Sequence, residues 1–165
     1  MPFEKTATRL WKRLSREERL AAATGFWQET PSEAAGAALG AIVKARHVRP
    51  QVARAYDAEE KARSLASVLD PGESVASALL VALHLGPRRA LLAPFLDAVG
   101  LPHENGILKD EADGPPVTEA AARAGVQALA GSFPRAEIET YLNTLWLQDP
   151  ERWEALAASP EWLSG

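Results

Sequence analysis

The side chains best equipped for chemistry gather in residues 100–116, GLPHENGILKDEADGPP, and at the predicted helix start before this segment. The candidate binding residues are Arg88, Arg89, His103, Glu104, Asn105 and Lys109. Guanidinium groups beside the free N–H groups of a helix start would hold a phosphate or a carboxylate. His103 would then be positioned for proton transfer to that ligand. The segment is a candidate anion-binding site of an enzyme or of a small-ligand receptor.

The same residues also fit a structural role. Adjacent residues such as His103 and Glu104 rarely converge on one metal, and the HExxH spacing is absent. His47 and His84 lie on separate predicted helices, so we expect no metal site, no cofactor and no catalytic residue. His103 and Asn105 would instead brace the connection through backbone hydrogen bonds, while the arginines pair with acidic residues of neighbouring loops. The acidic candidates are Asp70, Asp110 and Glu111.

The composition bounds the class of protein. With 165 residues, 47% of them hydrophobic and 24% charged, the chain has the size and balance of one globular domain. Its net charge of -4 argues against a nucleic-acid binder, because Lys and Arg supply most of the affinity for phosphate. The absence of cysteine excludes disulfides, thiolate nucleophiles and thiolate metal sites.

No segment of the sequence predicts a membrane anchor. The longest apolar run covers residues 74–85 and is much shorter than the roughly 20 residues that cross a bilayer. The basic N-terminal stretch lacks an apolar core of signal-peptide length. The sequence therefore predicts a cytoplasmic protein that does not bind membranes.

Helix is the preferred conformation almost throughout, because alanine, leucine, arginine and glutamate dominate and no stretch alternates apolar and polar residues like a strand. Prolines precede four helical patterns, where their missing N–H costs nothing: Pro31, Pro50, Pro134 and Pro150. Three pairs match the capping box, in which a side-chain acceptor precedes a glutamate by three residues: Ser15 with Glu18, Thr30 with Glu33, and Asp70 with Glu73. The predicted helices cover residues 3–14, 16–29, 31–46, 50–69, 73–85, 88–99, 117–131, 134–148 and 150–158.

The order of these helices indicates packed helical hairpins. Residues 30–56 align without a gap on residues 70–96, matching Pro31 with Pro71 at an offset of 40 residues. Repeats of this length are typical of helical solenoids, although a compact bundle produces the same hairpins. We predict an all-α fold in which residues 1–165 form one domain, a bundle of eight or nine helices, with a solenoid-like arrangement as the alternative. Residues 1–14 would form an amphipathic N-terminal arm, and residues 100–116 the longest loop.

Two glycines distinguish the predicted helix 31–46. Gly36 and Gly40 stand about one turn apart among alanines and leave a face without side-chain bulk. Another helix can approach such a face closely. We therefore expect this face to be tightly packed in the interior.

The C-terminal part is rich in tryptophan. Trp146, Trp153 and Trp162 fall within a short span and exceed what a terminal helix needs for docking. Tryptophan is enriched at binding hot spots, so an exposed member of this group indicates a protein interface or a dimer. The alternative is that these tryptophans pack together in the core and hold the C-terminal part against the bundle.

The residues together favour a binding or protein-interaction module. Helical hairpins with scattered arginines and surplus tryptophans suit a protein partner or a second copy of the chain. No nucleophile, metal cluster or glycine-rich phosphate loop is recognisable. The alternative is an enzyme or a small-ligand receptor with its anion-binding site between Arg88/Arg89 and residues 100–109. The sequence does not decide whether the chain catalyses a reaction.

Overall fold

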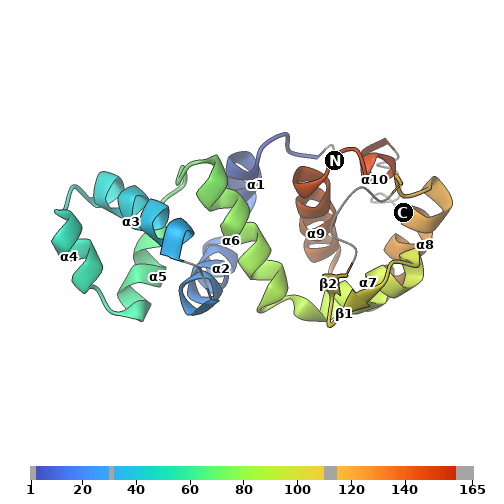
Figure 1. The fold of residues 1–165 in the computed structure, drawn as a ribbon, viewed down its shortest axis with the longest axis horizontal. Coiled ribbons are helices and arrows are strands. Elements are labelled where there is room, and N and C mark those ends of the chain that lie inside the picture. Colours follow the sequence, from blue (N-terminus) through green and yellow to red (C-terminus); the bar gives the residue numbers. More distant parts are fainter. Residues whose placement is uncertain (1–2, 30–31, 110–114, 159–165) are drawn as a thin grey trace. The chain divides into compact units, whose positions relative to one another are not determined.

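The structure, a computed structural model, describes residues 3–29, 32–109 and 115–158. The predicted all-α fold is confirmed, because these residues form ten α-helices, one 3₁₀ turn and one two-stranded sheet (Figure 1). Internal contacts divide the chain into two compact units. We call Thr6–Pro87 the six-helix unit, and Met1–Lys5 with Arg88–Gly165 the hairpin unit. The single domain, the helical-hairpin repeat and its solenoid-like alternative stay predictions.

The six-helix unit contains α1 (Ala7–Arg13), α2 (Arg16–Glu29), α3 (Ser32–Arg46), α4 (Pro50–Ala55), α5 (Ala58–Ala66) and α6 (Glu73–Leu85). Five of these helices each contribute a fully buried large side chain: Trp11, Phe26, Ile42, Leu65 and Leu79. α2 packs against both α5 and α6, so it lies at the centre of the unit (Figure 1). The indole Nε1 of Trp11 donates a hydrogen bond of 2.8 Å to the Val68 carbonyl, which satisfies its polar atom in the core.

Helix starts in this unit confirm one predicted capping box and overturn another. Ser15 and Glu18 exchange side-chain and backbone hydrogen bonds of 3.0 and 3.1 Å at the start of α2. The predicted Asp70–Glu73 pair is wrong, because Gly72, with φ of +94°, precedes α6 without a side-chain cap. Thr30, of the third predicted pair, lies outside the described residues.

The carboxylate of Glu73 caps a different helix. Its oxygens accept hydrogen bonds from the N–H groups of Ala7 and Thr8, at 2.5 and 3.2 Å, and from the Thr8 hydroxyl at 3.0 Å. Glu73 therefore satisfies first-turn donors of α1, and its negative charge lies at the positive end of that helix.

The predicted helix 50–69 is wrong as one element, because the chain breaks it into α4 and α5. Tyr56 leaves helical geometry, and the Asp57 carboxylate accepts a hydrogen bond of 2.8 Å from the Glu60 N–H. Asp57 and Glu60 have the same spacing as a capping box. The local signal for this break is therefore present in the sequence.

The predicted tight packing of α3 through its glycines is also wrong. Gly36 and Gly40 are exposed, and a Cβ atom added at either position would meet no heavy atom within 4 Å. The predicted helix 3–14 is shorter than expected as well, since only Ala7–Arg13 is helical and residues 3–5 belong to the hairpin unit.

The hairpin unit contains a 3₁₀ turn (Arg89–Leu91), α7 (Leu92–Val99), β1 (His103–Glu104), β2 (Ile107–Leu108), α8 (Glu119–Ala130), α9 (Arg135–Gln148) and α10 (Glu154–Ala158). α7 and α8 approach closely, because a Cβ atom at Gly125 would lie only 2.6 Å from the Phe95 ring. The Phe95 ring also contacts Tyr141 and Trp153, with centroids 5.2 and 5.7 Å away. These aromatic rings form the core of the unit.

The predicted loop 100–116 is wrong in its first half, which forms a β-hairpin. β1 and β2 are antiparallel, with His103 opposite Leu108 and Glu104 opposite Ile107. The two turn residues, Asn105 and Gly106, have φ of 52° and 87°. Positive φ at both central residues characterises the type I′ turn, for which Asn-Gly is the preferred sequence. Residues 110–114 of the predicted loop lie outside the described residues.

Candidate functional site

The structure brings three of the predicted binding residues together at the β-hairpin: Arg89, His103 and Asn105. The His103 Nδ1 accepts a hydrogen bond of 3.1 Å from the Gly106 N–H, and its Nε2 lies 2.7 Å from the Asp97 carboxylate. Because Nδ1 accepts, the proton of the neutral ring lies on Nε2 and is donated to Asp97. Both ring nitrogens are therefore occupied, and His103 fastens the turn to α7.

The two arginines have structural partners. The Arg89 Nε donates a hydrogen bond of 3.0 Å to the Asn105 carbonyl. The Arg88 side chain, 12% exposed, lies with its Nε 4.0 Å from the Glu137 carboxylate at the first turn of α9. Arg88 thus lies beside an acid at a helix start, whereas Asp110 and Glu111, two of the loop acids expected from the sequence, lie outside the described residues.

The remaining predicted residues add no convergent chemistry. Glu104 and Lys109 are exposed, and the Lys109 N–H is bonded to the Pro102 carbonyl at 3.1 Å. Among the described residues, no group of three or more His, Asp or Glu side chains could hold a metal ion. Burial raises the pKa of the Tyr141 phenol above its usual value, so this core hydroxyl stays protonated. The residues around the hairpin hold the backbone in place.

The tryptophans proposed as an interface differ in their surroundings. Trp153 is 2% exposed and packs on Phe95, so its ring belongs to the core of the hairpin unit. Trp146 is only half-buried at the C-terminal end of α9. Trp162 lies outside the described residues.

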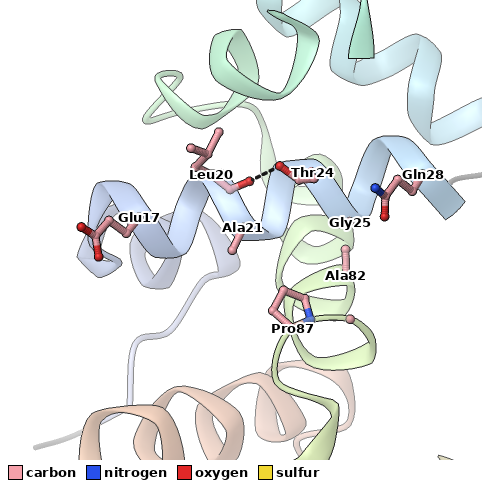
Figure 2. Close-up of a pocket in the computed structure, with 9 residues that line it drawn as sticks. Glu17, Leu20, Ala21, Thr24, Gly25, Gln28, Ala82 and Pro87 are labelled. Atoms are coloured by element: carbon pink, nitrogen blue, oxygen red, sulfur yellow. Dashed lines mark hydrogen bonds between the residues drawn. The ribbon is translucent and has the colours of Figure 1, made fainter. Parts of the chain in front are cut away.

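A groove that the sequence analysis did not single out opens in the six-helix unit (Figure 2). It has a volume of about 570 Å³ and lies between one face of α2 and the C-terminal end of α6. Its lining residues are Glu17, Leu20, Ala21, Thr24, Gly25, Gln28, Ala82, Gly86 and Pro87. All of them belong to the same unit.

The surface of this groove is mainly apolar. Leu20 is 39% exposed on its wall. The Thr24 hydroxyl donates to the Leu20 carbonyl at 2.8 Å, so its hydrogen is already bonded (Figure 2). A Cβ atom at Gly25 would lie 3.5 Å from the Ala82 carbonyl oxygen, which shows that the two helices cross closely there. Glu17 and Gln28 provide polar groups at the two ends of the α2 face.

The sequence holds only a weak signal for this groove. Residues 17, 20, 21, 24 and 28 have the spacing of one helix face. The neighbouring face carries Ala22, Ala23 and Phe26, which are apolar and buried. Because Glu17, Thr24 and Gln28 make the first face partly polar, the pattern favours burial of the Phe26 face, but it does not indicate a groove along the other face.

No protein-family model, no curated protein and no solved structure matches this chain. Within the described part of the chain, no single helix has the length and apolar character to cross a membrane. Among residues 3–29, 32–109 and 115–158, α6 combined with residues 89–99 passes this test as a bent pair, by length and composition alone.

Proposed function

We propose that the protein is a protein-interaction module that binds an amphipathic helix of a partner in the groove between α2 and α6. The observation that carries the proposal is the apolar groove of about 570 Å³ with Leu20 exposed on its wall. Exposed apolar surface in a concave site is a common feature of protein recognition. The groove could hold a few apolar side chains of one partner segment.

The walls favour a helix as the bound segment. Both walls are α-helices, whose central backbone N–H and C=O groups are bonded within the helix. They offer no strand edge to an extended peptide, so the partner must satisfy its own backbone hydrogen bonds. A helix does this and presents apolar side chains at i, i+3, i+4 and i+7.

The alternative, an enzyme or receptor with an anion site at the β-hairpin, has less support. Arg89, His103 and Asn105 are engaged in contacts that fasten the hairpin. An anion bound through the Arg89 Nε or through the His103 ring would have to replace these contacts. As in the sequence analysis, the expected partner is another protein or a second copy of the chain. Nucleic acid, membranes and cofactors are not part of the proposed function.

A peptide selection tests the groove directly. Displayed peptides with apolar residues at i, i+3, i+4 and i+7 are selected on the purified chain, and their dissociation constants are measured. Ala21→Trp fills the groove and should weaken the selected peptides at least about tenfold, the effect of losing roughly 1.4 kcal/mol. The matched control is Ala45→Trp, at an exposed position of α3 outside the groove.

Two results would contradict this proposal. One is a set of selected peptides that bind the Ala21→Trp variant as tightly as the unchanged chain. The other is equal binding of versions in which a central proline prevents the helix. The proposed location is the cytoplasm, as expected from the sequence. Fractionation of cells that produce the tagged chain tests this location.

A further inference from the structure

A second groove, of different chemistry, lies in the hairpin unit around Trp146. It has a volume of about 450 Å³ and opens where α9 ends and α10 begins. Its lining residues are Trp146, Pro150, Glu151, Glu154, Ala157 and Ala158. None of them lines the groove between α2 and α6.

The Trp146 ring already interacts with a cation of the chain itself. The Lys5 Nζ lies 5.0 Å from the centroid of the ring, within the range of a cation–π interaction. The Phe3 ring lies 6.1 Å away and is tilted against the indole. Because indole is the strongest of the aromatic cation acceptors, the half-buried ring attracts positive charge at this end of α9.

Two carboxylates add negative charge to the same groove. Glu151 and Glu154 line it and are exposed, and neither has an ion-pair partner among residues 3–29, 32–109 and 115–158. The C-terminal end of α9, at Gln148, adds the negative end of its helix dipole. Pro150, Ala157 and Ala158 supply an apolar wall.

We propose that this groove binds the positively charged side chain of a partner peptide. The cationic head would lie between the Trp146 ring and the carboxylates of Glu151 and Glu154. The aliphatic stem of a lysine or arginine would lie along Pro150 and the alanines, as such stems do on apolar surface. The site depends on residues of the hairpin unit only, so its test is independent of the groove between α2 and α6.

The test follows the indole N–H signal of Trp146 in NMR spectra of the full chain. The signal is assigned with Trp146→Phe. The probes are the acetyl amides of arginine and lysine, and the neutral control is the acetyl amide of citrulline, which has nearly the shape of arginine. We expect saturable shifts of the Trp146 signal with the two cations and none with citrulline.

Charge variants separate a specific site from general attraction. The double variant Glu151→Gln/Glu154→Gln should weaken binding of the arginine amide about fivefold or more, as expected for the loss of two nearby charges. The matched control, Glu59→Gln/Glu119→Gln, has the same net charge and changes exposed residues of α5 and α8. It should bind within about twofold of the unchanged chain, the scatter of weak surface charge effects.

Three results would overturn the proposal. They are citrulline shifts equal to those of arginine, an equal loss in the two double variants, and the absence of a saturable shift at Trp146. A failure here would leave the helix-binding proposal intact, because Ala21 and Trp146 belong to different units.

Discussion

Glu73 shows how a single side chain can stabilise a helix other than its own. It occupies the first position of α6, yet its carboxylate accepts hydrogen bonds from the first turn of α1. Burial and the neighbouring Asp70 raise the pKa of Glu73, but the hydrogen bonds from Ala7 and Thr8 outweigh them and leave the pKa below its usual value. The ionised form is therefore favoured by folding.

Replacing Glu73 tests this role. Glu73→Gln should lower the free energy of unfolding by about 1 kcal/mol at neutral pH, the usual effect of losing a helix cap. Because the folded-state pKa is depressed, the contribution is fully present above the unfolded-state pKa and is lost as the pH falls through the folded-state pKa. Urea unfolding of both proteins at several pH values should show the difference shrinking in acid.

Glu119 provides a matched control for Glu73. Glu119 also occupies the first turn of its helix, but α8 is capped by Thr118, whose side chain accepts from the Ala121 N–H. Glu119→Gln should change stability by less than about 0.5 kcal/mol, as for other surface charges. A Glu73 variant no less stable than this control would contradict the capping role.

For single residues, the hydrogen-bond partner of Ser15 was predictable from the sequence, whereas the partner of Glu73 was not. Ser15 and Glu18 are three residues apart, so their capping box is visible in the sequence. Glu73 and Ala7 are 66 positions apart, and the spacing of the letters gives no sign of their contact. The partner of Glu73 depends on how α1 and α6 pack.

At the scale of elements, glycine has opposite consequences in two helices. In α8, Gly125 lies under the Phe95 and Val99 side chains of α7, where a Cβ atom would be 2.6 and 2.7 Å from their carbons. In α3, Gly36 and Gly40 face open space. Only the first position uses the small volume of glycine for helix packing.

Alanine substitutions should therefore change stability in opposite directions. Gly125→Ala should lower the free energy of unfolding by about 1–3 kcal/mol, because the methyl group overpacks the contact between α7 and α8. Gly40→Ala should raise it by about 0.5–1 kcal/mol, since alanine has the higher helix propensity and meets no neighbour. Urea unfolding measures both changes, and a gain in both variants would contradict the close packing of α8.

Proline and capping pairs marked some of the element boundaries but not all of them. The predicted range 73–85 agrees with α6, whereas the range 50–69 misses the break at Asp57. The β-hairpin was missed although Asn105–Gly106 is a strong turn signal, because its strands have only two residues each. Such short strands carry too few side chains for an alternating pattern.

The grooves were less predictable than the helices. The groove along α2 depends on how much of the partly polar face of α2 stays uncovered, and the groove at Trp146 depends on the turn that places α10 beside it. Both properties arise from packing within a unit. Sequence patterns report the character of a helix face but not whether another helix covers it.

At the scale of the whole molecule, the hairpin unit uses residues from two distant parts of the chain. The Glu4 N–H donates to the Asn143 Oδ1 at 2.8 Å, and the Asn143 Nδ2 donates to the Glu4 carbonyl at 3.1 Å. Asn143 is 2% exposed and Glu4 is half-buried, so both hydrogen bonds are partly shielded from water. Residues 3–5 are thereby fastened to α9.

Removing this amide should loosen the N-terminal attachment. Asn143→Ala should lower the free energy of unfolding by about 1–3 kcal/mol, because it removes both hydrogen bonds from the half-buried backbone of Glu4. Hydrogen exchange of the Glu4 amide should become faster in this variant. Gln127→Ala, at an exposed position of α8, is the control. Unchanged exchange at Glu4 in the Asn143 variant would contradict the attachment.

The contact between residues 3–5 and α9 affects the order in which the chain can fold during synthesis on the ribosome. Glu4 and Asn143 are 139 positions apart, so the first residues leave the ribosome long before their partner helix exists. At typical elongation rates this delay is roughly ten seconds. All residues of the six-helix unit emerge within that time and can fold first, whereas Phe3 stays without its aromatic partner and accessible to chaperones until α9 has been made.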